Sequence, residues 1–292
     1  MKLAAIDIGS NAIRLQITNV LTYKDQVNFK KMEYVRFPLR LGHDVFTNGK
    51  ISGKNERRFI ELMRAFKILI DLYEVEGSYA CATSAMRESK NGREIIARVK
   101  KELDLEIHII EGELEAELIN KSLSAVIDHQ TYVHIDVGGG STEFNVFVNQ
   151  QKVAANSFKI GSVRRLEKND LPEIWNEMEA WLKQNVKSVF GKPIAIGTGG
   201  NIGKAHELAK IKPGKPISMT KLEEVKEYLS GFDQYEKTHL LLLNPDRADV
   251  IVPALEIYIA SMKWSRCKKM IVPDVGLKDG LVHLLYERTK AK

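Results

Sequence analysis

The sequence predicts an α/β protein made of two similar domains, each with a mixed β-sheet flanked by helices. Two observations carry this prediction: a strand–turn–strand segment that occurs twice, and strands that alternate with helices between and after the copies. A length of 292 residues suits two domains of ordinary size. With 44% hydrophobic and 28% charged residues, the composition excludes a disordered or fibrous chain.

The duplicated segment comprises residues 4–15 and 133–144, which align without gaps. Each copy has a β-branched strand that leads to an aspartate, Asp7 or Asp136, followed by a small-residue turn and a second strand. This pattern is typical of a β-hairpin. The copies are far too widely separated for a solenoid repeat, so they indicate duplication of a whole domain. We expect the two hairpins to face each other across a cleft.

Helices and strands alternate through the rest of the chain, as judged from apolar spacing. In the first half we expect helices over 59–72, 91–101 and 112–125, and strands over 78–83 and 105–110. In the second half we expect helices over 172–190, 246–263 and 277–288, a helix after Gly200, and strands over 193–196 and 269–272. Pro253 is expected to kink the helix over 246–263.

The best domain boundary lies near residues 125–130. We therefore expect a first domain over 1–125, joined by the C-terminal helix at about 280–292, and a second over 126–279. Closure of the two domains is expected to hinge at this boundary.

Charge and cysteine content limit the function classes. The net charge of +6 is spread along the chain, and no dense basic tract with interleaved aromatic residues favours nucleic-acid binding. Cys81 and Cys267 are too few for a disulfide framework or a cysteine zinc site, and they indicate a reducing compartment. There is no apolar run long enough for a membrane span and no signal peptide, so a cytoplasmic address is expected.

Glycine-rich turns are the first candidates for a binding site. Consecutive glycines at 138–140, followed by Ser141 and Thr142, let backbone N–H groups converge on an anion. Alone, a tight hairpin without ligand is equally plausible, but the similar turn at 9–11 favours two phosphate-binding loops. Neither turn matches the P-loop or the dinucleotide fingerprint. A third cluster at 197–200 precedes a helix, whose N-terminus attracts phosphate, although this signal is weak.

Charged residues beside these turns are the next candidates. Asp7 and Asp136 require a partner, which is either Mg²⁺ or an N–H group of the turn. Arg14 and Glu143 occupy equivalent positions. Strand alternation places them one residue off the aspartate face, although the geometry of the turn can redirect them. A catalytic pair and a simple ion pair across the cleft both remain open. Arg87 follows a short strand and is either a phosphate ligand or a surface arginine.

An acidic run at Glu111, Glu113, Glu115 and Glu117 begins a predicted helix, where negative charge is favoured by the helix dipole. We interpret three of these four as a solvated helix cap. The histidines lack metal-ligand spacing, no nucleophile elbow is present, and Cys81 has no evident partner. Acyl transfer through serine or cysteine is therefore not supported.

Seven short motifs occur in an order that resembles the exopolyphosphatase and guanosine pentaphosphate phosphohydrolase family, Ppx/GppA. The resemblance covers essentially the whole chain. The motifs are residues 6–15, 82–87, 136–143, 161–164, 197–200, 247–250 and 276–281.

This resemblance implies two ribonuclease-H-like domains of the actin-like ATPase superfamily and an active site in the cleft. It implies release of terminal phosphate from polyphosphate, guanosine pentaphosphate or both, with Mg²⁺ or another divalent cation, and a homodimer. It makes Glu115 the catalytic base, assisted by Glu143, and makes Asp136, Glu143 and Asp7 metal ligands. The implied phosphate-binding residues are Ser10, Asn11, Arg14, Arg87, Gly139, Gly140, Ser141, Thr142, Gly199 and Gly200.

The chain departs from the family pattern at three positions that concern substrate preference. Glu117 stands where an arginine is common, Glu111 where a serine is usual, and Asn201 where threonine is frequent. The chain resembles the short, two-domain members. A phosphohydrolase is the predicted function; a superfamily phosphotransferase and a non-catalytic polyphosphate or alarmone sensor are the alternatives. No nucleic-acid or membrane partner is expected.

Overall fold

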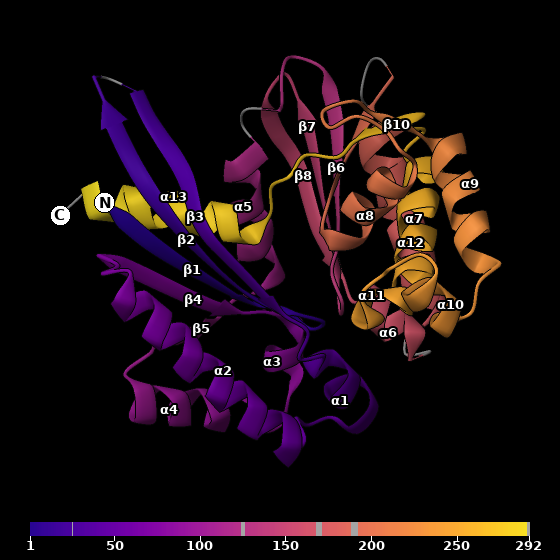
Figure 1. Cartoon of the computed structure of the whole chain (residues 1–292). Helices are drawn as coiled ribbons and strands as arrows, with labels where there is room; N and C mark the ends of the chain where they lie inside the picture. Colours follow the sequence, from indigo (N-terminus) through magenta and orange to yellow (C-terminus); the bar gives the residue numbers. More distant parts are fainter. Residues whose placement is uncertain (25, 124–125, 168–170, 188–191, 291–292) are drawn as a thin grey trace. The chain divides into compact units, whose positions relative to one another are not determined.

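The computed structural model describes residues 1–24, 26–123, 126–167, 171–187 and 192–290. The chain divides into two compact units, Met1–Ser122 with Gly276–Lys292, and Leu123–Val275 (Figure 1). Residue 125, where the sequence places a helix end and the start of the hinge, lies outside the described residues, as does residue 190, the expected end of another helix.

The first unit contains a sheet with strand order β3-β2-β1-β4-β5. Its strands are β1 (Lys2–Ile8), β2 (Ile13–Tyr23), β3 (Gln26–Phe37), β4 (Gly77–Ala82) and β5 (Ile107–Ile109). The first three are antiparallel, and β4 and β5 continue the sheet in parallel. The helices are α1 (Leu41–Asn48), α2 (Gly53–Leu72), α3 (Ser84–Glu88), α4 (Gly92–Leu103), α5 (Gly112–Leu123) and α13 (Leu277–Lys290).

The second unit contains a sheet with strand order β10-β11-β9-β6-β7-β8. Its strands are β6 (Thr131–Val137), β7 (Thr142–Val148), β8 (Gln151–Phe158), β9 (Ile194–Thr198), β10 (Ile217–Ser218) and β11 (Lys269–Ile271). The helices are α6 (Ser162–Leu166), α7 (Pro172–Lys187), α8 (Gly200–Leu208), α9 (Met219–Ser230), α10 (Gln234–His239), α11 (Pro245–Ala248) and α12 (Ile251–Trp264).

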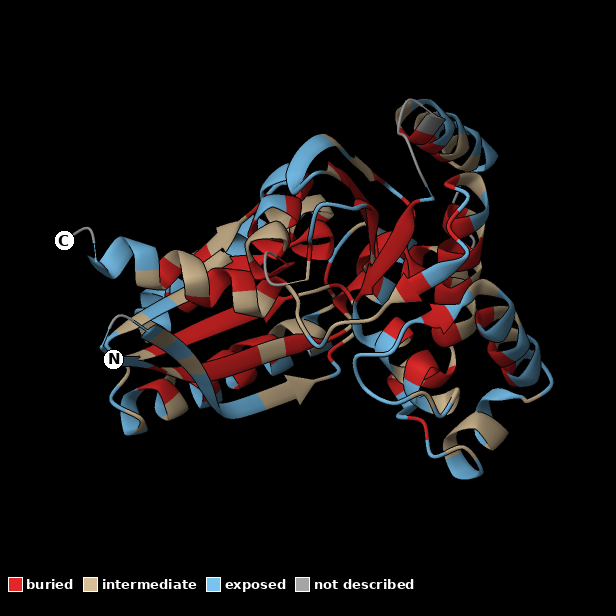
Figure 2. Ribbon diagram, turned by 90° about the horizontal axis from the view of Figure 1, so that it is seen from above, coloured by how far each residue is buried: buried red, intermediate tan, exposed pale blue. Residues whose placement is uncertain are grey.

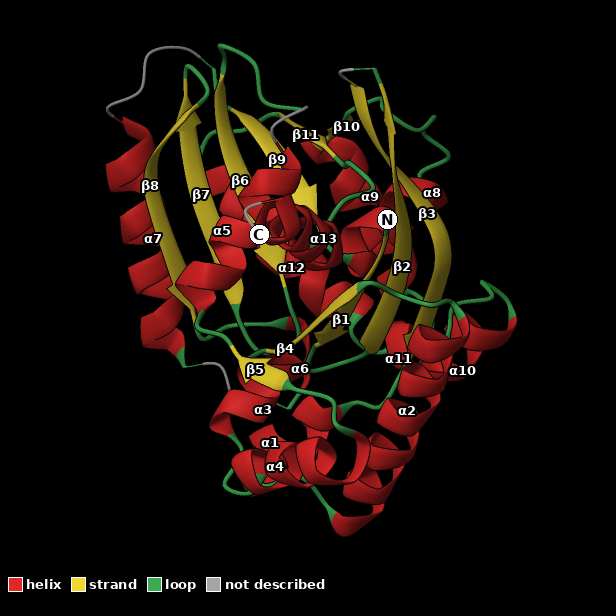
Figure 3. Ribbon diagram, turned by 90° about the vertical axis from the view of Figure 1, so that its left-hand side faces the viewer, coloured by secondary structure: helices red, strands yellow, loops and turns green. Residues whose placement is uncertain are grey.

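The two sheets repeat one topology, as the alignment of the hairpins predicts. In each unit three strands form an antiparallel meander, and the fourth lies parallel to the first (Figure 3). Both hairpin turns are closed by the same bond: the N–H of Gly9 donates to Ala12 O at 3.2 Å, and that of Gly138 to Ser141 O at 2.9 Å. The predicted fold class, two mixed α/β sheets with flanking helices, is confirmed.

The register of both hairpins corrects one expectation. Asp7 lies directly opposite Arg14, and Asp136 directly opposite Glu143. Opposed residues of an antiparallel pair project from the same face. The expectation that Arg14 and Glu143 lie off the aspartate face was wrong, because it counted alternation through the turn as though the turn were extended strand.

The helix expected over 246–263 is two helices. The chain breaks between α11, which ends at Ala248, and α12, which begins at Ile251. Pro253 therefore occupies the first turn of α12, where its missing N–H removes no intrahelical bond. The kink expected at Pro253 was wrong for this reason.

In the first unit, β1 forms the centre of the core. Residues 3–6 are completely buried (Figure 2), because α13 packs on β1, β2 and β4 while α2 and α4 lie on the opposite face (Figure 1). Gly280 in α13 lies directly on α5: a Cβ at this position would stand 1.9 Å from the carbonyl oxygen of Leu118. This contact allows the two helix backbones to touch.

Substitution of Gly280 tests that contact. Gly280→Ala is expected to lower the free energy of unfolding by about 1–3 kcal/mol, because the helices must separate and this outweighs the gain of about 1 kcal/mol in helix propensity. Gly203→Ala in α8 is the control, since nothing lies within 4 Å of the added methyl group. Chemical denaturation of both variants measures the difference, and equal effects would contradict the contact.

A buried histidine connects three strands in the second unit. His134 is fully buried; its Nδ1 is 3.0 Å from the side-chain amide of Asn145 and its Nε2 is 2.8 Å from the hydroxyl of Thr198. With the Asn145 amide as donor to Nδ1, the imidazole is neutral and carries its proton on Nε2. Burial lowers the pKa of His134 to about 3.

This lowered pKa predicts acid sensitivity. The unfolded chain takes up a proton as the pH falls below about 6.5, whereas the folded chain resists protonation until about pH 3. The contribution of His134 to stability is therefore complete above pH 6.5 and falls by about 2 kcal/mol between pH 8 and pH 5. Denaturation of His134→Gln at both pH values is expected to show a correspondingly smaller loss. The exposed control His239→Gln is expected to keep the loss of the unmodified protein; an identical loss in His134→Gln would refute the assignment.

Candidate active site

The chain that follows β3 hydrogen-bonds to the carbonyl groups of the first hairpin turn. The carbonyl of Ser10 accepts the N–H of Gly42 at 2.7 Å, and the carbonyl of Asn11 accepts the N–H of Arg40 at 2.9 Å. The buried hydroxyl of Ser10 also lies 2.9 Å from that of Ser84 in α3. The turn therefore has a fixed conformation, with its carbonyl groups bound by its own unit.

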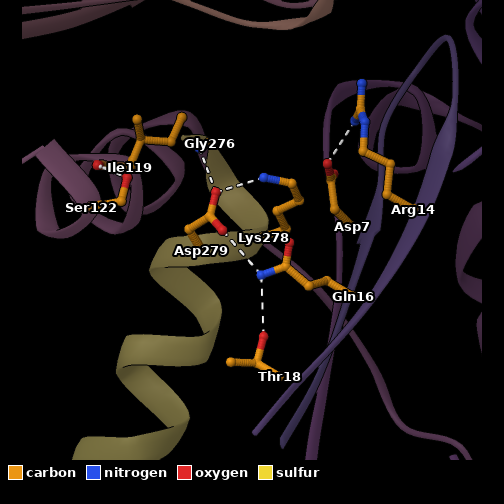
Figure 4. Close-up of polar contacts among 9 residues, drawn as sticks. All are labelled: Asp7, Arg14, Gln16, Thr18, Ile119, Ser122, Gly276, Lys278 and Asp279. Carbon is orange, nitrogen blue, oxygen red and sulfur yellow. Dashed lines mark hydrogen bonds and ion pairs between the residues drawn. The ribbon is translucent and has the colours of Figure 1, made fainter. Parts of the chain in front are cut away.

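The carboxylate that ends β1 is neutralised within the hairpin. Arg14 Nη1 donates to Asp7 Oδ2 at 2.6 Å, and Asp7 is only 6% exposed (Figure 4). Cys81 on β4 lies beside Asp7 in the parallel register. Burial raises the pKa of the Cys81 thiol well above its usual value, and the negative charges of Asp7 and Glu115 raise it further. The same effect places Glu115 close enough to Cys81 to act on its charge, near the ends of β1 and β4.

The acidic start of α5 separates into two kinds of residue. Glu113 and Glu117 are exposed, whereas Glu115 is half-buried. Exposed Glu111, just before the helix, lies 3.5 Å from Arg87 Nε, while Arg87 Nη1 donates to the carbonyl of Ile110 at 2.5 Å. The Arg87 guanidinium is thus oriented by the chain between β5 and α5, with the carboxylate of Glu111 beside it.

The side chain of Gln16 on β2 joins the first hairpin to the start of α13. Gln16 Nε2 donates to Asp279 Oδ1 at 3.0 Å, and Asp279 Oδ2 accepts from the N–H of Gly276 and from Lys278 Nζ (Figure 4). Gln16 is 3% exposed. This connection fixes β2 to α13, and it uses Gly276, Lys278 and Asp279 of the motif at 276–281.

The glycine loop of the second unit is held in a similar way. The carbonyls of Gly138 and Gly139 accept backbone N–H groups from Ser162 and Val163, both at 2.9 Å. Within the described residues, the N–H groups of Gly139 and Gly140 donate to no protein acceptor. The carbonyls of Gly138 and Gly139 point to the α6 side, so the N–H groups of Gly139 and Gly140 are free donors of the loop.

The hydroxyl groups at the end of the loop differ in their roles. Thr142 is completely buried, and its Oγ1 donates to the carbonyl of Ile160 at 2.6 Å. The Ser141 hydroxyl has no hydrogen-bond partner among the residues that the structure describes. The phosphate-binding role predicted for Thr142 therefore competes with a structural bond, whereas Ser141 has no such competing bond.

Two carboxylates lie side by side at this end of the second sheet. Asp136 is half-buried and Glu143 is almost completely buried. Ser157 Oγ on β8 donates to Glu143 Oε1 at 2.9 Å. The second hairpin thus carries two carboxyl groups where the first carries an ion pair.

The third glycine cluster approaches Asp136 closely. Gly199 has φ of 107°, which favours glycine, and a Cβ there would lie 3.2 Å from Asp136 Oδ1. The buried Tyr258 hydroxyl accepts the N–H of Val137 at 3.2 Å and donates to the carbonyl of Thr198. Burial raises the pKa of this phenol well above its usual value, and the charge of Asp136 adds to the effect.

The carboxylates beside the two turns are the available oxygen ligands for a divalent cation. No group of three or more histidine, cysteine, aspartate or glutamate side chains converges to hold an ion in the part of the chain that is described. Asp7 already binds Arg14, so it is a poor metal ligand. Asp136 and Glu143 fit Mg²⁺, which commonly uses one or two carboxylates and completes its shell with water and substrate phosphate.

The structure also adds residues with no assigned role in the sequence analysis. Arg247 Nη2 lies beside the start of α8, where a Cβ on Gly200 would be 2.8 Å away. Arg36 on β3 lies directly opposite Arg14. The motif at 247–250 was the available signal for Arg247, whereas nothing in the sequence pattern indicates Arg36, because the strand that carries it was not predicted.

Comparison with known proteins identifies the family. A model of the Ppx/GppA phosphatase family matches residues 20–288. The chain belongs to this family. Membership confirms the predicted resemblance and the predicted enzyme class, a hydrolase of phosphoanhydride bonds.

Curated relatives are similar over most of the chain. A bifunctional 3-dehydroquinate synthase/phosphatase of Fusobacterium nucleatum is 31% identical; the alignment covers 85% of this chain and 41% of that protein. Exopolyphosphatase 1 of Mycobacterium bovis is 24% identical, over 97% of this chain and 87% of the relative.

Solved structures share the fold. An exopolyphosphatase from Cytophaga hutchinsonii superposes with a TM-score of 0.85 at 22% identity, covering 99% of this chain and 98% of that one. The Ppx/GppA family member from Aquifex aeolicus gives 0.76 at 24% identity, covering 100% and 99%. These likenesses show that the chain shares the fold of these Ppx/GppA proteins over nearly its whole length. No described helix in the Ppx/GppA chain is long and apolar enough to cross a bilayer.

The two hydroxyls of the glycine loop provide a test of their different roles. Thr142→Val is expected to lower the free energy of unfolding by about 1–2 kcal/mol, because the Ile160 carbonyl loses its donor in a buried site. Ser141→Ala is expected to change stability by less than about 0.5 kcal/mol. Urea denaturation of the two variants measures this. A larger loss for Ser141→Ala than for Thr142→Val would contradict the assignment.

Proposed function

We propose that this protein releases terminal phosphate from inorganic polyphosphate, guanosine pentaphosphate or both. Its place in the Ppx/GppA phosphatase family and its exopolyphosphatase relatives support this substrate class. The observation that carries the proposal is the pair of equivalent hairpin turns. Each turn has its carbonyl groups bound by its own unit. Beside the strand-end carboxylate, the first turn has Arg14 and the second has two loop amides. Such turns suit the oxygens of a phosphate group.

In the first unit, Ser10, Asn11, Arg14 and Arg87 are proposed to bind substrate phosphates. Arg14 keeps its charge beside Asp7, and a guanidinium has several N–H donors with which to bind an anion. Arg87 is oriented by Ile110, but Glu111 competes with phosphate for the same guanidinium. This competition suits a narrower substrate range than that of relatives with a serine at this position.

In the second unit, Gly139, Gly140 and Ser141 are proposed to hold the transferred phosphoryl group, with Gly199 and Gly200 at the start of α8 as further donors. Phosphoryl transfer has a loose transition state, so fixed donors around the phosphoryl oxygens supply most of the catalysis. Asp136 and Glu143 are the proposed metal ligands. When bound there, Mg²⁺ supplies positive charge beside the phosphate oxygens.

Glu115 is proposed to orient water and accept its proton for in-line attack on the terminal phosphorus, with Glu143 assisting. Its half-buried carboxylate, near the ends of β1 and β4, is suited to a base better than those of its exposed neighbours. A homodimer and a cytoplasmic address remain predictions.

Phosphate release from polyphosphates of graded length and from guanosine pentaphosphate, with and without Mg²⁺, tests the function. The proposal expects metal-dependent release without any acceptor. ADP formed from ATP only when an acceptor is present would instead identify a phosphotransferase. Binding of polyphosphate or guanosine tetraphosphate without phosphate release under any divalent metal would identify a sensor.

Substitution of the proposed base gives the most direct prediction. Glu115→Gln is expected to lower kcat by about 10²–10⁴-fold, because the amide cannot accept the proton, while polyphosphate binding is retained. Glu113→Gln on the exposed side of the same helix turn is the matched control and is expected to keep normal turnover. Steady-state kinetics with calorimetric binding distinguish the two. Near-normal turnover in Glu115→Gln would remove Glu115 from the mechanism.

A further inference from the structure

The segment 161–164, between β8 and the body of α6, binds every carbonyl of the glycine loop. The Ser162 N–H and hydroxyl both donate to the carbonyl of Gly138, at 2.9 and 3.2 Å. The N–H groups of Val163 and Arg164 donate to the carbonyl of Gly139 at 2.9 and 3.0 Å. The Arg164 side chain completes the set, because its Nε donates to the carbonyl of Gly140 at 2.9 Å.

Close backbone contact accompanies these bonds. A Cβ on Gly161 would stand 2.5 Å from the carbonyl carbon of Gly139 and 2.6 Å from the N of Gly140. Only glycine therefore allows the segment to approach the loop at this distance. The N–H groups at the start of α6 donate to the loop carbonyls. They are therefore not available to an anion, and the segment supports the loop instead.

In the first unit, main-chain N–H groups bind the carbonyls of the turn. There the carbonyl of Asn11, which is equivalent to that of Gly140, accepts the backbone N–H of Arg40. In the second unit a guanidinium replaces this main-chain donor. Arg164 is 8% exposed, so its cation is buried at the back of a loop that has no side chains of its own at 138–140.

We propose that Arg164 is a positioning residue: by fixing the carbonyl of Gly140, its side chain sets the direction of the Ser141 amide at the end of the loop toward phosphate. Glycine has no Cβ to restrict its backbone, so the loop depends on external bonds for its conformation. A peptide plane whose carbonyl is fixed on the α6 side directs the N–H of the following residue to the opposite side. The expected effect of Arg164 on turnover rests on the proposed function. Its expected effect on the direction of the loop amide does not.

The kinetic test uses Arg164→Met, which keeps the apolar length and removes the donor. Its kcat/KM for phosphate release is expected to fall about 10²-fold, mainly through kcat, as when one fixed donor to a developing oxyanion is lost. Arg164→Lys keeps the charge and is expected to recover part of the loss. Arg165→Met is the matched control from the next position of α6, because Arg165 binds Glu256 and contacts the Trp175 ring instead of the loop.

The structural test uses inorganic phosphate as the probe and follows the backbone ¹⁵N–¹H signal of Ser141 in the full chain. This signal is expected to shift with phosphate in the unmodified protein and in Arg165→Met. Arg164→Met is expected to bind phosphate at least tenfold more weakly. Gly161→Ala displaces the loop from the same side and is expected to weaken phosphate binding to the same extent. This variant replaces Arg164→Met in the test if Arg164→Met fails to fold.

The outcomes separate this proposal from the proposed function. If no substrate releases phosphate but Arg164→Met weakens the amide response, the function fails and the positioning role stands. If the Ser141 signal does not shift with phosphate in the unmodified protein, the positioning role is overturned. It is equally overturned if folded Arg164→Met matches Arg165→Met in kcat/KM and in phosphate affinity.

Discussion

The bond that closes each hairpin turn is the constraint on which the candidate site depends. An N–H of the first turn residue donates to the carbonyl three positions later, in Gly9–Ala12 and in Gly138–Ser141 alike. This bond sets the register, and the register puts Asp7 opposite Arg14 and Asp136 opposite Glu143. A shift by one residue would move one side chain of each pair to the other face of its sheet.

The duplicated hairpins have diverged in charge while they kept this geometry. In the first, Asp7 and Arg14 cancel each other in a short ion pair. In the second, Asp136 and Glu143 are both acidic, and Ser157 and the backbone of Gly199 lie close to them. The two units therefore suit different tasks, the first offering guanidinium groups to an anion and the second offering oxygen ligands to a cation.

The sequence was sufficient for the fold class, since a gapless repeat is strong evidence of duplication and the motifs identified the family. It was insufficient where tertiary contacts decide local structure. The exposed strand β3 lacks a clear apolar alternation, so Arg36 was not found, and the break before α12 depends on the fold more than on Pro253. The structural bond of Thr142 to Ile160 is likewise invisible in the sequence, because it joins residues on either side of β8.

Gly280 and Leu118 touch through their backbones, and Gln16 reaches Asp279 across 263 positions of the chain. On the ribosome, the first unit emerges first but lacks the helix that covers β1 until the whole second unit has been synthesised. The second unit, continuous in sequence, can complete its core during translation. The order of maturation is then the reverse of the order of synthesis, and the nascent first unit must keep one apolar sheet face exposed while it waits for its last helix.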